Sequence, residues 1–148
     1  MPIAPNSRKL GELIARIRSA EGPDRDLDVK IDTILNRIEW RPYRENARKL
    51  WGHGPDGKVL RHGIDSCPPV TASLDAACAL LKRLLPGWSW QVHTESRRED
   101  GFCAAVWCSW GGSAYQRHVG EAFPTPALAI VFAVLACLLN DPEAADSS

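Results

Sequence analysis

The chain has 148 residues, and its composition is typical of one globular domain. Apolar residues make up 45% of it and charged residues 24%, which excludes a predominantly disordered protein. Lysine and arginine total 18, as do aspartate and glutamate, so the chain lacks the positive field of a nonspecific nucleic-acid binder. We therefore expect a single domain over residues 1–148 that folds without a partner.

Residues 7–38 are predicted to form a helical hairpin. From Ser7, which can cap the first turn, to Ser19, apolar residues recur every three or four positions. A Gly-Pro pair then breaks the pattern, and Asp24 can cap a second helix that extends to about Ile38. Residues 1–10 lack the charged and then apolar pattern of a secretory signal, which predicts a cytoplasmic protein.

Residues 39–69 are predicted to form a mostly irregular connection, because periodicity fades there while glycine and proline recur. Within this segment, we expect a short helix from Pro42 through Leu50 and a brief edge strand over residues 58–61. The segment also contains Cys67, which precedes two prolines and is expected to be the most exposed cysteine. The five cysteines are an odd number without tight spacing, so we expect reduced thiols, most of them packed in the core.

Residues 70–139 are predicted to form the core, in which a three-stranded antiparallel meander lies between two helices in sequence. Ser73 caps the first helix, and the pair Pro86-Gly87 ends it. Strands are expected over residues 88–93, 102–110 and 115–122. Both faces of the middle strand are apolar, so we expect helices on both faces of the sheet.

The last predicted helix extends from Thr125 to about Leu139 and is apolar nearly all round. It is shorter than the roughly twenty residues that span a bilayer, so it is more typical of a central core helix. Residues 140–148 are an acidic tail that we expect to fray. The predicted fold class is therefore α+β, a small three-stranded antiparallel sheet covered by helices on both faces in an α/β/α sandwich.

Three sequence stretches resemble a known family. They are Thr71-Ala-Ser-Leu-Asp-Ala-Ala, Leu85-Pro-Gly-Trp-Ser-Trp and Thr125-Pro-Ala-Leu-Ala-Ile, with Gly22-Pro-Asp-Arg-Asp-Leu-Asp as a weaker match. Together they are similar to the phage ABA sandwich domain, a group of small proteins encoded in phages and prophages of proteobacteria, over roughly residues 52–139. The resemblance implies a three-layer helix, sheet, helix arrangement. Since these motifs cap helices and turn the chain, the resemblance transfers no catalytic residue.

The sequence contains no recognisable catalytic, phosphate-binding or metal-binding motif. His93, Cys103, Cys108 and His118 lie on or beside neighbouring strands, but their spacing does not match a zinc site, and alternation places the two cysteines on opposite faces. The glycine-rich loop over residues 52–57 lacks the lysine of a phosphate-binding loop. No local motif sets a nucleophile beside a base. We therefore expect no cofactor, no metal and no enzymatic activity.

Basic and aromatic residues interleave over residues 37–51. Protein interfaces are enriched in Trp, Tyr and Arg, so this pattern favours a protein partner, although the same side chains suit stacking on nucleic-acid bases. A structural interpretation is that the rings anchor the connection onto the domain. The predicted partner-binding residues are Trp40, Arg41, Tyr43, Arg44, Arg48 and Trp51, together with Arg97 and Arg98 of the turn between the first two strands of the meander.

These observations predict a small, non-enzymatic accessory protein of a phage or prophage that binds a host or phage protein, for example one that blunts a host defence. The alternative is a nucleic-acid or nucleotide-binding module that uses residues 37–51. A homodimer through the last helix stays open, and no membrane association is expected.

Overall fold

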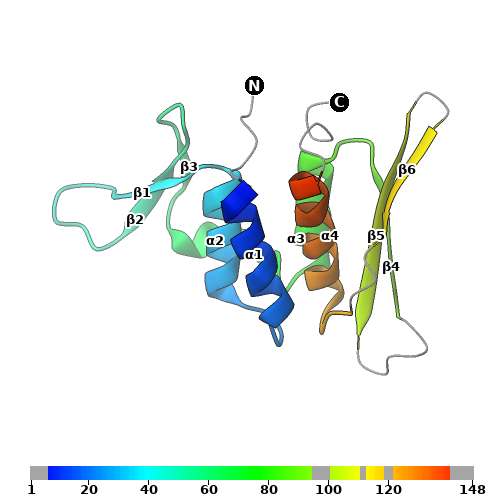
Figure 1. Ribbon diagram of the computed structural model, residues 1–148. Coiled ribbons are helices and arrows are strands. Elements are labelled where there is room, and N and C mark those ends of the chain that lie inside the picture. The colour runs from blue at the N-terminus through cyan, green and yellow to red at the C-terminus, as the bar shows by residue number, and fades with distance from the viewer. Residues whose placement is uncertain (1–6, 95–100, 111–112, 119–121, 141–148) are drawn as a thin grey trace.

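The computed structural model describes residues 7–94, 101–110, 113–118 and 122–140. Within these ranges, four α-helices lie between two three-stranded antiparallel sheets, one sheet at each end of the molecule (Figure 1). The predicted acidic tail lies outside the described residues, apart from Asn140. The α+β class expected from the sequence is confirmed.

The N-terminal helices α1 (Ser7–Ser19) and α2 (Arg25–Leu35) form the predicted hairpin (Figure 1). The carboxylate of Asp24 caps α2 by accepting a hydrogen bond of 3.1 Å from the Leu27 N–H. The helix ends earlier than predicted, because Arg37 has a φ of 51°, outside the helical region. The buried apolar stripe of α1 consists of Leu10, Leu13, Ile14 and Ile17.

Helix α4 (Pro126–Asn140) is the centre of the fold. It packs against α1, against α3 (Leu74–Leu84) and against the middle strand of the C-terminal sheet, and every side chain from Ala127 to Leu135 is buried. The Thr125 hydroxyl caps α4 by accepting from the Leu128 N–H at 3.1 Å. The prediction of a central core helix is confirmed, and no helix among the described residues is both long and apolar enough to cross a membrane.

The C-terminal sheet is the predicted meander. Its strands β4 (Ser89–Thr94), β5 (Phe102–Trp110) and β6 (Ser113–His118) pair antiparallel in sequence order. Preceding it, α3 is capped by Ser73, whose hydroxyl accepts from the Ala76 N–H at 3.2 Å, as predicted.

The layer order differs from the expected α/β/α sandwich, because the described helices lie on only one face of this sheet (Figure 1). Ala104 and Val106 of β5 point into the helical core, whereas Cys103 and Ala105 alternate onto the opposite face. Both are nevertheless buried, at 0% and 4% exposure. Their cross-strand partners include the longer side chains of His93 and Gln91, and such neighbours shield small residues without a covering helix. An apolar strand face made of small residues therefore does not by itself indicate a covering helix.

The expected irregular connection over residues 39–69 is wrong. This segment forms a second sheet of β1 (Glu39–Pro42), β2 (Leu50–His53) and β3 (Val59–Arg61), followed by a short 3-10 helix, η1 (Ile64–Ser66). The short helix expected from Pro42 to Leu50 is absent from this described segment, which contains the turn between β1 and β2 instead. The predicted edge strand near residues 58–61 is confirmed as β3.

Gly52 lies inside strand β2 rather than in a turn, although glycine is a typical turn signal in a sequence. It pairs with Trp40 across the sheet, and an added Cβ would lie 3.0 Å from Cζ3 of Trp40 and 2.7 Å from Cγ2 of Ile38. The absence of a side chain lets both residues pack over the strand. The turns themselves use Asn46 and Gly57, which have φ values of 63° and 82°.

Thr71 joins three segments that are distant in the sequence. Its backbone N–H and its hydroxyl both donate to Oδ1 of Asp28, at 2.8 and 2.7 Å, and the hydroxyl oxygen accepts from the Asp24 N–H at 2.9 Å. The Thr125 hydroxyl donates to the Thr71 carbonyl at 3.4 Å. Asp28 also pairs with Arg25 at 3.3 Å. The start of α2, the loop before α3 and the start of α4 are thereby held together.

Candidate partner-binding surface and polar pocket

The sheet β1–β3 has an inner face toward α2 and an outer face away from it. Strand register places Trp40 opposite Gly52 and Arg41 opposite Trp51, and neighbouring residues of a strand point to opposite faces. The indole N–H of Trp40 donates to the Thr33 hydroxyl of α2 at 2.9 Å, which fixes Trp40 to the inner face. Arg41 and Trp51 therefore belong to the outer face.

Three rings gather on the outer face. Tyr43 stacks on Trp51 with a centroid distance of 5.3 Å, and His62 meets the same indole edge-on at 4.8 Å. The Arg44 guanidinium lies 5.1 Å from the centre of the Tyr43 ring, within cation–π range. We name this surface the basic aromatic face; it consists of Arg41, Tyr43, Arg44, Trp51 and His62.

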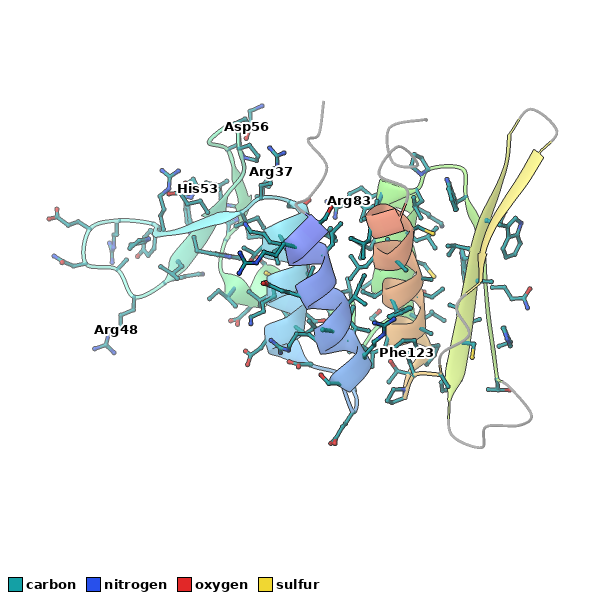
Figure 2. All side chains as sticks on the ribbon, in the orientation of Figure 1. Arg37, Arg48, His53, Asp56, Arg83 and Phe123 are labelled. Carbon is teal, nitrogen blue, oxygen red and sulfur yellow. The ribbon has the colours of Figure 1, made fainter. Side chains whose placement is uncertain are left out.

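The electrostatic character of this part of the chain is positive, unlike that of the chain as a whole. Residues 37–63 contain seven Lys or Arg and three Asp or Glu. Arg41 pairs with Glu39 at 3.1 Å, but both side chains are more than half exposed, so the pair contributes little to stability. Arg44 and Arg48 are also exposed, and Arg48 projects from the turn between β1 and β2 (Figure 2). The basic groups are therefore open to a partner.

The structure brings together most of the predicted binding residues, but not all. Arg41, Tyr43, Arg44 and Trp51 share the basic aromatic face. Trp40 lies on the inner face, where it anchors the sheet to α2 as the structural interpretation expected. Arg97 and Arg98 lie outside the described residues. His62 joins the cluster without having been predicted, because its contact with Trp51 depends on the sheet that the sequence did not reveal.

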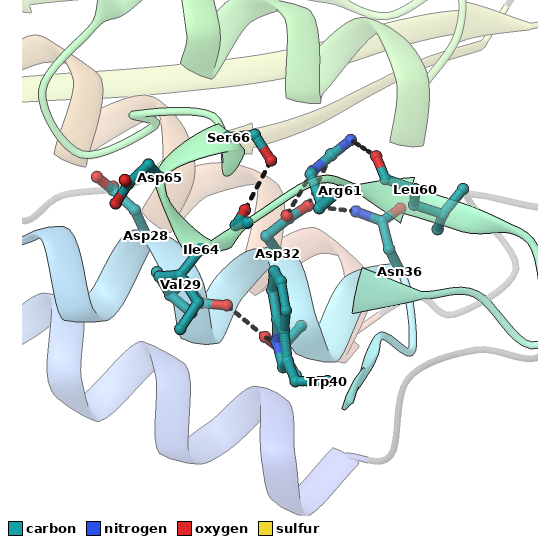
Figure 3. A network of polar contacts seen from close by, with 12 residues as sticks. Asp28, Val29, Asp32, Asn36, Trp40, Leu60, Arg61, Ile64, Asp65 and Ser66 are labelled. Atoms are coloured by element: carbon teal, nitrogen blue, oxygen red, sulfur yellow. Dashed lines mark hydrogen bonds and ion pairs between the residues drawn. The ribbon is translucent and has the colours of Figure 1, made fainter. Parts of the chain in front are cut away.

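A second feature is a chain of polar contacts on the inner side of the same sheet (Figure 3). Arg61 of β3 donates two hydrogen bonds to the buried carboxylate of Asp32, at 2.8 and 3.0 Å. The Asn36 amide donates to the same carboxylate at 2.6 Å, and Arg83 of α3 donates to the amide oxygen of Asn36. Hydrogen bonding to Asp32, and next the opposite charge of that carboxylate, raise the pKa of Arg61, so its guanidinium stays protonated near neutral pH.

These contacts border a pocket of about 350 Å³ between α2, β3 and α3. Its lining is mostly apolar, with two carboxylates and two guanidinium groups. The lining residues are Asp28, Ile31, Asp32, Arg61, Pro68, Val70, Ala76, Ala79, Leu80 and Arg83. Local sequence patterns did not reveal this pocket, since its residues come from segments up to 55 positions apart.

Cys67 corrects a further expectation, because it is buried at 2% exposure rather than being the most exposed cysteine. Burial and the hydrogen bond of its thiol to Asp32 raise the pKa of Cys67 to about 12. The reactive form of a cysteine is the thiolate, so Cys67 is a poor nucleophile. No group of three His, Cys, Asp or Glu residues positioned for a metal ion occurs in the described part of the chain.

No protein-family model, curated protein or solved structure matches this chain. The resemblance to the phage ABA sandwich domain therefore stays a prediction. Two features of the structure are candidate binding sites. They are the basic aromatic face on the outer side of the sheet β1–β3 and the polar pocket on its inner side.

Proposed function

We propose that this chain is a small, non-enzymatic accessory protein that binds an acidic surface of another protein through the basic aromatic face. The observation that carries the proposal is the Tyr43–Trp51–His62 ring cluster with Arg44 beside it. Tyr, Trp and Arg dominate the binding energy of protein interfaces. The resemblance to phage ABA sandwich proteins supports a phage or prophage origin, a host or phage protein as the partner, an anti-defence role and a bacterial cytoplasmic location.

The attachment of the sheet to the rest of the molecule supports a binding role for its outer face. Its inner face is tied to α2 by the Trp40–Thr33 hydrogen bond and the Arg61–Asp32 ion pair. A surface held in place before binding loses less entropy when a partner binds. The basic aromatic face is open apart from Trp51, which is half-buried: Tyr43 is 39% exposed and follows the end of strand β1, and Arg41, Arg44 and His62 are also exposed. Its side chains are therefore available for recognition.

The alternative is a nucleic-acid or nucleotide binder that uses the same surface. The exposed Tyr43 ring with Arg44 over it favours this alternative, because aromatic rings and guanidinium groups stack on bases. The two functions differ in their response to salt. Binding to phosphates releases counterions, so affinity falls by orders of magnitude between about 50 and 200 mM salt when six or more phosphates are contacted.

The test combines charge reversal with a matched control. A triple variant, Arg41→Glu, Arg44→Glu and Arg48→Glu, should lose the partner that the wild-type protein retains from host cells. The control variant reverses three exposed lysines elsewhere, Lys9, Lys30 and Lys82, and makes the same change in net charge. It should bind like the wild type. Both variants should keep the wild-type melting temperature, because all six side chains are exposed.

Retention of the partner by the arginine variant would refute the assignment of this surface. Equal loss of binding in both variants would mean that net charge, rather than the basic aromatic face, controls the interaction. Binding of single-stranded oligonucleotides with a steep salt dependence, in the absence of any protein partner, would favour the alternative.

A further inference from the structure

The pocket between α2, β3 and α3 is separate from the basic aromatic face, since it lies on the inner side of the sheet β1–β3. Its volume of about 350 Å³ falls in the range of small-molecule sites. Because a water molecule occupies about 30 Å³ of liquid, the pocket can hold on the order of ten non-hydrogen atoms. Its walls are largely apolar, formed by residues such as Ile31, Val70 and Leu80.

The two carboxylates of the pocket already have hydrogen-bond donors. Asp28 accepts from the N–H and hydroxyl of Thr71 and pairs with Arg25, while Asp32 accepts from Arg61 and Asn36. A cationic ligand would have to displace donors from carboxylates that are 2% and 5% exposed. The carboxylates are therefore structural, and a cation is a poor fit to this pocket.

In contrast to the two carboxylates, the Arg83 guanidinium has N–H donors that are available to a ligand. One terminal nitrogen of its guanidinium, Nη1, donates to Asn36, which fixes the group between α3 and the end of α2 (Figure 2). Nε and Nη2 have no hydrogen-bond partner among the described residues, and the side chain lines the pocket. Asn36 is itself held by Asp32, so the guanidinium is oriented before a ligand arrives. A guanidinium fork of this kind recognises a carboxylate with two parallel hydrogen bonds.

We propose that this pocket binds a small organic acid, with its carboxylate on Arg83 and its apolar body against Ile31, Val70 and Leu80. A single negative charge suits the site, because Asp28 pairs with Arg25 and Asp32 with Arg61. The positive charge of Arg83 is thereby left without a carboxylate partner among the described residues. A phosphate dianion would be repelled by the aspartates and would leave the apolar walls unfilled. The inference is independent of the proposed protein partner.

The experiment is a titration of the full-length protein, uniformly labelled with ¹⁵N, followed by amide NMR shifts. Sodium hexanoate is the probe, hexanamide is its uncharged analogue, and inorganic phosphate is the test for a simple anion site. Arg83→Gln removes the guanidinium, and Lys82→Gln removes the neighbouring charge, which does not line the pocket. Ala76→Leu fills the pocket and tests its apolar part. Circular dichroism and melting temperature establish that each variant is folded.

Hexanoate should bind saturably, with shifts concentrated at the amides of Ala76, Ala79 and Leu80. The Arg83→Gln variant should bind hexanoate about tenfold or more weakly than the wild type, because the charge-assisted pair of hydrogen bonds is lost. The wild type should bind hexanamide more weakly than hexanoate by a similar factor, for the same reason. Lys82→Gln should match the wild type, and Ala76→Leu should abolish binding. The proposal is overturned by the absence of saturable shifts, by equal affinity for hexanoate and hexanamide, by unchanged binding in a folded Arg83→Gln variant, or by tighter binding of phosphate than of hexanoate.

Discussion

Replacement of Thr71 by valine should destabilise the protein by about 3 kcal/mol, although the two side chains have nearly the same shape. Thr71 is fully buried, and its hydroxyl makes two hydrogen bonds, to the Asp28 carboxylate at 2.7 Å and from the Asp24 N–H at 2.9 Å. A hydrogen bond to a charged group contributes about 1.5–3 kcal/mol, and a stranded buried donor costs about 1–3 kcal/mol. After the substitution, the Asp28 carboxylate still accepts from the Thr71 N–H and from Arg25, so the total loss stays near the lower end of the combined range.

Serine at the same position provides the control. Thr71→Ser keeps the hydroxyl and deletes one buried methyl group, which should cost only about 1 kcal/mol. Urea denaturation followed by tryptophan fluorescence measures both changes, with equal slopes required for a valid comparison. The reasoning fails if the valine variant is as stable as the serine variant, since the Asp24–Thr71–Asp28 contacts would then contribute nothing beyond packing.

Three further changes test other parts of the fold. Gly52→Ala should cost about 1–3 kcal/mol in urea denaturation, because the new Cβ would lie 2.7 Å from Cγ2 of Ile38; an unchanged midpoint would contradict the packing of Trp40 over this strand. Gly11→Ala should instead stabilise the protein by about 0.5–1 kcal/mol, since it lies inside α1 with open space at its Cβ. Folded protein binds the Cys67 proton more tightly than unfolded protein, so this residue should lower stability progressively from about pH 9 toward pH 12. Cys67→Ala should show a flatter stability profile over that range, and parallel profiles would disprove the burial of the thiol beside Asp32.

The elements predicted correctly from the sequence are those specified by local signals. Helix caps at Asp24 and Ser73 act within one turn, and the stripe of α1 repeats over a few residues. The burial of α4 follows from its composition, because a helix that is apolar all round needs neighbours on every side. Such features depend on residues that are adjacent in the chain, so the sequence alone is sufficient to find them.

The sheet β1–β3 could not be found in this way. Its strands have three or four residues, too few to establish an alternating pattern, and Gly52 imitates a turn signal inside a strand. The stretches that resemble phage ABA sandwich proteins were interpreted as separate caps and turns. In the structure, the stretch from Gly22 to Asp28 meets the stretch that begins at Thr71, because Thr71 and Asp28 are hydrogen-bonded although they are 43 positions apart.

The two candidate sites also differ in whether their residues are close together in the sequence. The basic aromatic residues were recognised from composition within one short segment, and Arg41, Tyr43, Arg44 and Trp51 indeed share one face. The pocket depends on contacts between Arg61 and Asp32, 29 positions apart, and between Arg83 and Asn36, 47 positions apart. Isolated arginines and aspartates in a sequence do not reveal which of them will pair, because the pairing is set by the packing of α2, β3 and α3.

The measurement that tests the proposed function most directly is native mass spectrometry of the protein gently isolated from cells of its own host. The wild type and the Lys9, Lys30 and Lys82 control variant should each carry the same protein partner in a fixed ratio. The variant with glutamate at positions 41, 44 and 48 should appear without it. A spectrum in which the wild type carries a nucleic acid and no protein, or in which the arginine variant keeps the partner, would contradict binding of a protein through the basic aromatic face.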